Sequence, residues 1–166
     1  NFMSLFNAIN QMAEKYDMPI LYSCHPRSRN RLAASGFQLD SRVIQHEPLG
    51  FHDYNCLQMN AFAVVSDSGT LPEESSFFTS VGHPFPAICI RTSTERPEAI
   101  DKGDFIIAGI DEKSLLQAVD TAVELCKDGQ HGIPVPDYVD ENVSTKVVKI
   151  VQSYVGIVNK MVWRKY

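Results

Sequence analysis

The sequence predicts an α/β domain in which a doubly wound, mostly parallel sheet is flanked by helices. Three observations predict it. Apolar residues recur at helical spacing in some segments and form short continuous runs in others, the two patterns alternate along the chain, and no internal repeat or low-complexity tract interrupts them. A chain of 166 residues is long enough to bury one core. We therefore expect residues 1–166 to form a single α/β domain.

The alternation begins with a helix. In residues 2–15 apolar side chains recur at helical spacing, and residues 19–22 then form a short apolar run suited to a buried parallel strand. Residues 27–34 have a helical pattern and are followed by Gly36, a typical helix stop. Residues 42–45 are the next strand candidate.

The middle of the chain continues the same order. We expect a helix from about 52–59, followed by residues 61–65, which are apolar throughout and predict a central strand. A helix over 73–80 and strands over 86–90 and 105–108 complete the expected sheet.

Two helices are expected after the last strand. Apolar residues at helical spacing mark one over 115–123 and the other over 147–158, and residues 129–137 between them contain the Gly and Pro typical of a loop. The final helix packs either on its own domain or on another one.

Composition and charge exclude several functions. A net charge of -5 gives no basis for a nucleic-acid surface or an anionic membrane as partner, and no apolar run approaches the roughly 20 residues that span a bilayer. The four cysteines lie too far apart for a zinc-type pair, so we expect buried reduced thiols, a cytoplasmic protein, and neither a metal nor another cofactor. The chain begins at Asn1 without a signal-peptide pattern, and we expect it to be part of a longer protein.

A polar turn follows the strand expected at 61–65. In a doubly wound sheet, ligands bind beyond the carboxyl ends of strands, often against a helix N-terminus. Gly69 in this turn allows close approach of a ligand to the backbone or a positive φ, and Ser68 and Thr70 add hydroxyl donors. The turn therefore predicts an anion site, for a group such as a diphosphate.

The start of the following helix has a second interpretation. Thr70 and Glu73 fit a capping box, with Pro72 tolerated in the first turn, and that accounts for both residues without a ligand. Glu74 is not needed for the cap. It is either an acceptor for a ribose diol or a first-turn partner of the helix dipole.

Three motifs resemble the non-hydrolysing UDP-N-acetylglucosamine 2-epimerases. They are Ser66-Asp67-Ser68-Gly69-Thr70-x-x-Glu73-Glu74, Gly82-x-Pro84, and Arg91-x-x-Thr94-Glu95-Arg96-Pro97-Glu98. The resemblance implies the C-terminal half of a two-domain, GT-B-like fold. It also implies that Ser68, Gly69 and Thr70 hold the diphosphate of a UDP-sugar, that Glu74 binds the ribose hydroxyls, and that Arg96 contacts the diphosphate region.

Two further positions come from the same resemblance. Tyr54 falls where the family places an aromatic residue near uracil, although a partly buried helix tyrosine explains it equally well. His25 corresponds to a position linked in some members to a second, regulatory UDP-sugar, and its alternative is a structural histidine. Residues 82–86 and 90–94 resemble a subgroup acting on UDP-N-acetyl-6-deoxyhexoses for capsule or O-antigen synthesis.

The resemblance also implies what lies elsewhere. Catalytic carboxylates belong to the family's N-terminal domain, so we expect no catalytic residue in this chain, a missing N-terminal domain as partner, and a homodimer of the full-length protein. Three alternatives stay open at this point: the donor domain of a GT-B glycosyltransferase, a hydrolysing epimerase, and a module that senses UDP-sugars without turnover.

Overall fold

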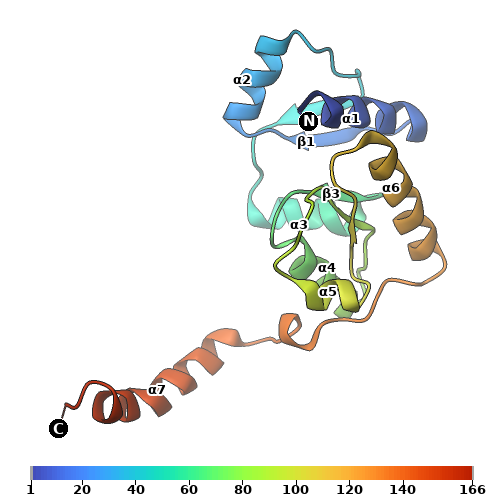
Figure 1. The fold of residues 1–166 in the computed structure, drawn as a ribbon. Coiled ribbons are helices and arrows are strands. Elements are labelled where there is room, and N and C mark those ends of the chain that lie inside the picture. The colour runs from blue at the N-terminus through green and yellow to red at the C-terminus, as the bar shows by residue number, and fades with distance from the viewer. Residues whose placement is uncertain (1, 166) are drawn as a thin grey trace.

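A computed structural model describes residues 2–165 and has parallel strands surrounded by helices (Figure 1). The helices are α1 (Phe2–Tyr16), α2 (Pro26–Ser35), α3 (Phe51–Asn60), α4 (Leu71–Ser80), α5 (Pro97–Asp101), α6 (Glu112–Lys127) and α7 (Val143–Met161), with a 3-10 turn at Pro136–Tyr138. The strands are β1 (Ile20–Ser23), β2 (Val43–His46), β3 (Val64–Ser66), β4 (Ala87–Cys89) and β5 (Ile106–Ile107). The α/β class is confirmed, and α5 and the 3-10 turn are elements that the sequence pattern did not predict.

The strands form two sheets where one was expected. β1 pairs with β2, and β3, β4 and β5 follow one another in a second sheet; every pairing is parallel. Within residues 2–165 the expectation that residues 61–65 form a central strand is wrong: β3 is an edge strand there, and β4 is the central and fully buried one. β1 and β3 each have a partner on one side only within residues 2–165.

Two apolar clusters hold the body together. The first joins α1 and α6, which lie side by side in Figure 1, through Phe6 of α1 and Leu115 of α6, both 0% exposed. The Phe6 ring meets Tyr22 edge to face at a centroid distance of 5.7 Å. The second cluster lies around α4 and includes Leu71 and Phe78. The apolar face of α1 is therefore buried in the first cluster, as its helical spacing predicted.

Buried hydroxyl groups fix α4 to the segment between α5 and β5 and to the loop that follows α6. The Ser75 hydroxyl donates to the carbonyl oxygen of Asp104 at 2.7 Å, and the Ser76 hydroxyl oxygen accepts from the N–H of Val135 at 2.7 Å. Ser75 and Ser76 are 1% and 0% exposed. Residues 129–137, expected as a loop, are thereby held against the helix whose N-terminus follows β3.

Asp104 is a buried carboxyl group at this junction. It is 4% exposed, and neither carboxylate oxygen has a hydrogen-bond partner at normal distance among the described residues. Burial raises its pKa, and the nearby Ser76 hydroxyl opposes this with a smaller effect. Folding therefore makes this carboxyl group harder to ionise than it is in the unfolded chain.

Replacing Asp104 by Asn should remove a contribution that lowers stability as pH rises. A raised folded-state pKa means that the folded chain binds more protons than the unfolded chain between the two pKa values, so this group lowers the free energy of unfolding as pH rises from about 4. We expect the stability of Asp104→Asn relative to wild type to increase over that range. Urea denaturation of both proteins from pH 4 to 7 measures the difference, and a constant difference would contradict the assignment.

Helix α7 extends away from the body (Figure 1). None of its residues is buried, and most of its apolar side chains are more than half exposed, among them Val148, Ile150, Tyr154 and Ile157. Packing of this helix on its own domain, one of the two expectations, is therefore wrong. No helix within residues 2–165 has the length and apolar character to cross a membrane.

Candidate functional site

The turn between β3 and α4 places two hydroxyl groups at the helix N-terminus. The N–H of Ser68 donates to the Ser66 hydroxyl oxygen at 3.0 Å, and the N–H of Thr70 donates to that of Ser68 at 3.2 Å. These local bonds fold residues 66–70 into a compact turn. Since first-turn N–H groups have no partner within a helix, the start of α4 presents donors suited to an anion beside this turn.

The hydroxyl groups are hydrogen-bonded in a chain that ends at a carboxylate. Thr70 Oγ1 donates to Glu74 Oε1 at 2.7 Å and lies 2.8 Å from Ser68 Oγ. Thr70 has one hydroxyl proton, so when it donates to Glu74 the Ser68 hydroxyl must be the donor in the second contact. The structure thus brings together Ser68, Thr70 and Glu74, three of the residues singled out from the sequence.

The expected capping box is absent. Thr70 precedes α4 but has helical backbone angles (φ -88°, ψ -11°), and its side chain makes no capping hydrogen bond. Glu73 instead pairs with Arg96, whose Nε and Nη2 lie 2.7 and 2.6 Å from Glu73 Oε1. The pairing raises the pKa of Arg96, which keeps its positive charge beside the start of α4.

Glu74 also receives a hydrogen bond from a residue that the motifs did not include. Gln58 Nε2 donates to Glu74 Oε2 at 2.6 Å and to the Tyr54 phenol oxygen at 3.1 Å. Tyr54 is half-buried, and burial followed by the charge of Glu74 raises its pKa. The four-residue spacing of Tyr54 and Gln58 predicts a shared helix face, but nothing in the sequence pattern indicated that Gln58 is buried.

Gly69 lies against Arg91. A Cβ atom at Gly69 would be 3.7 Å from Arg91 Nη1, an ordinary contact, and φ at Gly69 is outside the left-handed region. Of its two sequence interpretations, positive φ is therefore wrong, and close approach of a ligand stays a prediction. Arg91 Nε donates to the Asp67 carbonyl at 2.6 Å and Nη1 to Glu95 at 3.0 Å, which holds a second guanidinium beside the turn.

His25 has a local structural contact. Its Nδ1 accepts a hydrogen bond from the N–H of Arg27 at 3.3 Å, which caps α2. No hydrogen bond links its side chain to the turn after β3 in the described part of the chain. The regulatory role implied by resemblance stays a prediction.

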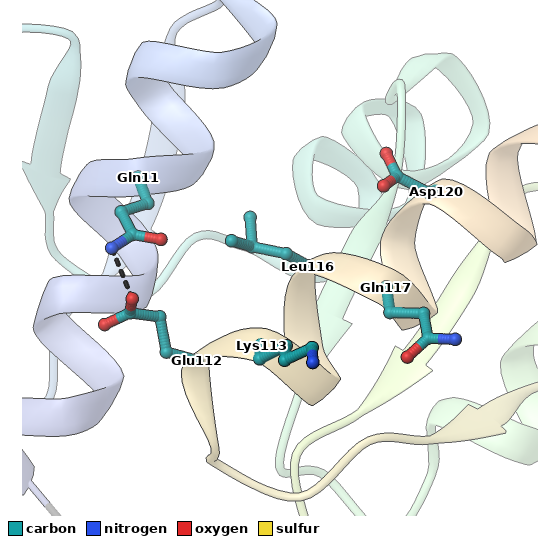
Figure 2. A pocket seen from close by; sticks show the side chains of 6 residues that line it. All are labelled: Gln11, Glu112, Lys113, Leu116, Gln117 and Asp120. Atoms are coloured by element: carbon teal, nitrogen blue, oxygen red, sulfur yellow. Dashed lines mark hydrogen bonds between the residues drawn. The ribbon is translucent and has the colours of Figure 1, made fainter.

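The hollow in Figure 2 lies elsewhere. It has a volume of about 630 Å³, and polar side chains of α1 and α6 line it; Gln11 donates a hydrogen bond to Glu112 across it. None of the residues predicted from the motifs lines it. Within residues 2–165 no group of three or more His, Cys, Asp or Glu residues could hold a metal ion. The expectation of buried thiols holds for Cys24 and Cys89 but is wrong for the exposed Cys56.

Comparison with known proteins gives a consistent result. The family model for UDP-N-acetylglucosamine 2-epimerase matches residues 1–152. The chain is 30% identical over 131 residues to the UDP-N-acetylglucosamine 2-epimerase of Methanococcus maripaludis, which covers 76% of the chain and 34% of the relative. It is 32% identical over 116 residues to that of Bacillus subtilis, covering 69% and 29%. The chain thus spans about a third of the length of these curated relatives.

Solved structures agree in fold. The UDP-N-acetylglucosamine 2-epimerase of Rickettsia bellii has a TM-score of 0.85 and 37% identity, covering 99% of the chain and 44% of that protein. The Methanocaldococcus jannaschii enzyme, solved with UDP-GlcNAc and UDP, has a TM-score of 0.76 at 24% identity and covers 91% and 40%. With the family model matching most of its length, the chain belongs to the UDP-N-acetylglucosamine 2-epimerase family.

Proposed function

We propose that the chain is the UDP-binding half of a UDP-N-acetylglucosamine 2-epimerase. The observation that carries the proposal is the turn after β3, where the Ser68 and Thr70 hydroxyls reach the Glu74 carboxylate at the start of α4, and Arg96 pairs with Glu73 in the first turn of the same helix. Positive charge and helix N–H groups favour a diphosphate, and a carboxylate favours a ribose diol. The M. jannaschii relative, solved with UDP-GlcNAc and UDP, supports this ligand class.

The proposed reaction exchanges the configuration at C2 of a UDP-2-acetamido sugar. A base removes the C2 proton as the bond from C1 to the UDP oxygen breaks, which gives a 2-acetamidoglucal and UDP. UDP then adds back to C1, and a proton is delivered to C2 on the opposite face. We assign the acid and base to the N-terminal half of the full-length protein, so this chain holds UDP and performs no turnover alone.

Helix α7 is the surface on which we expect that half to pack. Its exposed apolar side chains need a cover, and the chain spans only about a third of its curated relatives. The part of the full-length protein outside this chain would also supply a strand between β1 and β3. We further propose that the full-length protein is a homodimer. Four free cysteines support a cytoplasmic location. The proposed substrate is a UDP-N-acetyl-6-deoxyhexose used for surface polysaccharide.

Titration with UDP tests the proposal directly. We expect the backbone amide resonances of residues 66–75 to shift first, because the diphosphate would contact their N–H groups. Uridine, which lacks the diphosphate, is the control ligand and should bind far more weakly. Shifts confined to other residues, or none at millimolar UDP, would count against the site. Epimerisation by the chain alone would contradict the assignment of catalysis to the other half.

A further inference from the structure

Helix α3 buries a polar side chain and exposes apolar ones. Gln58 is 2% exposed and is the one buried residue of this helix, whereas Phe51 and Leu57 are 77% and 40% exposed. An amide removed from water is unfavourable unless its hydrogen bonds are replaced. The contacts of Gln58 must therefore explain why α3 presents it to the interior.

Those contacts use both N–H groups of the amide. One is directed to Glu74 Oε2 at 2.6 Å and the other to the Tyr54 phenol oxygen at 3.1 Å. Because an ionised carboxylate only accepts hydrogen bonds, the amide nitrogen must face Glu74. A hydrogen bond to an ionised group is among the strong ones, so the orientation of the Glu74 carboxylate is fixed from the protein interior.

The two oxygens of Glu74 have different surroundings. Oε2 is held by the buried amide, while Oε1 accepts from the hydroxyl of Thr70, an exposed residue. A ligand hydroxyl arriving from solvent can replace the Thr70 hydroxyl at Oε1 without disturbing the Gln58 contact. The carboxylate therefore has one anchored oxygen and one exchangeable oxygen.

We propose that Gln58 is a positioning residue that holds the Glu74 carboxylate so that Oε1 faces the ribose hydroxyls. The inference rests on the proposed function, in which Glu74 binds the ribose. Orienting the carboxylate before the ligand arrives removes an ordering step from binding. Gln58 thereby contributes to recognition of the ribose without touching it. Tyr54 accepts from its amide nitrogen, while the buried Gln58 Oε1 has no hydrogen-bond partner among the described residues.

The test compares UDP with 2′,3′-dideoxyuridine diphosphate, which keeps the base and diphosphate but lacks the diol. We expect wild type to prefer UDP by about tenfold or more, the effect of a hydrogen bond to a charged group. Gln58→Met, close in volume, should bring this ratio close to one, and Glu74→Gln should do the same. In the Glu74→Gln background, Gln58→Met should change the ratio no further. Gln130→Met, an exposed glutamine after α6, is the matched control and should keep the wild-type ratio.

Gln58→Glu gives a readout that a merely structural role would not produce. Two carboxyl groups at this distance share one proton at low pH, and that proton replaces the amide donor; at higher pH both ionise and repel. The ratio of this variant should approach wild type at low pH and fall as pH rises. Both ligands carry the diphosphate, so its own titration does not change the ratio of their affinities.

The outcomes separate the two proposals. If wild type binds neither ligand, the proposed function fails. If wild type prefers UDP and folded Gln58→Met keeps that preference, the role of Gln58 is wrong. If Gln58→Met does not fold by circular dichroism, Gln58→Glu decides: a pH-independent, wild-type ratio overturns the proposal, and loss of the ratio at high pH supports it.

Discussion

Gly132→Ala should destabilise the chain by about 2–5 kcal/mol. A Cβ atom at Gly132 would lie 2.7 Å from the carbonyl carbon and oxygen of Gly103 and 2.9 Å from the Asp104 nitrogen. These are backbone atoms, which cannot rotate away, so overpacking contributes about 1–3 kcal/mol. The positive φ of +84° adds about 1–2 kcal/mol for any residue with a Cβ.

Gly129→Ala is the matched control for Gly132→Ala. Gly129 lies in the same loop with φ +75°, but a Cβ there has no neighbour within 4 Å. Its free energy of unfolding should fall only by the about 1–2 kcal/mol that a positive φ costs a residue with a Cβ atom. Urea denaturation of both variants measures the difference, and equal losses would show that the contact of Gly132 with Gly103 does not hold the loop.

Gly69→Ala should have the opposite profile, with unchanged or higher stability and weaker UDP binding. The new Cβ would make an ordinary contact with Arg91, and φ needs no glycine, so the change reduces the freedom of the unfolded chain at no strain. If the diphosphate approaches the backbone of this turn, the methyl group displaces it. An overpacking penalty of about 1–3 kcal/mol corresponds to a loss of affinity of about fivefold to 150-fold.

Thermal unfolding and UDP titration of the same Gly69→Ala sample check both halves of this prediction. Gly50→Ala is a suitable comparison, since a Cβ there meets only the Asp53 side chain, at 3.9 Å, and Gly50 lies before α3. It should leave the affinity for UDP unchanged. Full UDP affinity in Gly69→Ala would mean that the ligand does not approach the backbone at this position.

The sequence predicted the order of the elements better than their neighbours in the sheet. Helical spacing in α1 and the apolar runs at β1 and β4 depend on local periodicity, and the structure confirms all three elements, although β1 is partly exposed where a buried strand was expected. The edge position of β3 could not be read locally, because an apolar run has the same composition whether it has one partner or two. The exposure of α7 likewise depends on what packs against it.

The candidate site shows the same division. The turn with Ser68 and Thr70 follows from a strand ending at a helix, a pattern visible in sequence. The capping box was wrong because Arg96, 23 residues away, competes for Glu73. The sequence did not predict Gln58 because an amide in a helix usually faces water, and only the fold places it beside Glu74.

The two separate sheets have a consequence for how the chain behaves in solution. Within residues 2–165, β1 and β3 each present one side without a neighbouring strand, and such edges are templates for added strands. A chain handled by itself is therefore prone to concentration-dependent self-association through these edges. A strand from another segment that paired with both β1 and β3 would cover these two edges, join the two sheets into one, and remove the tendency to self-associate.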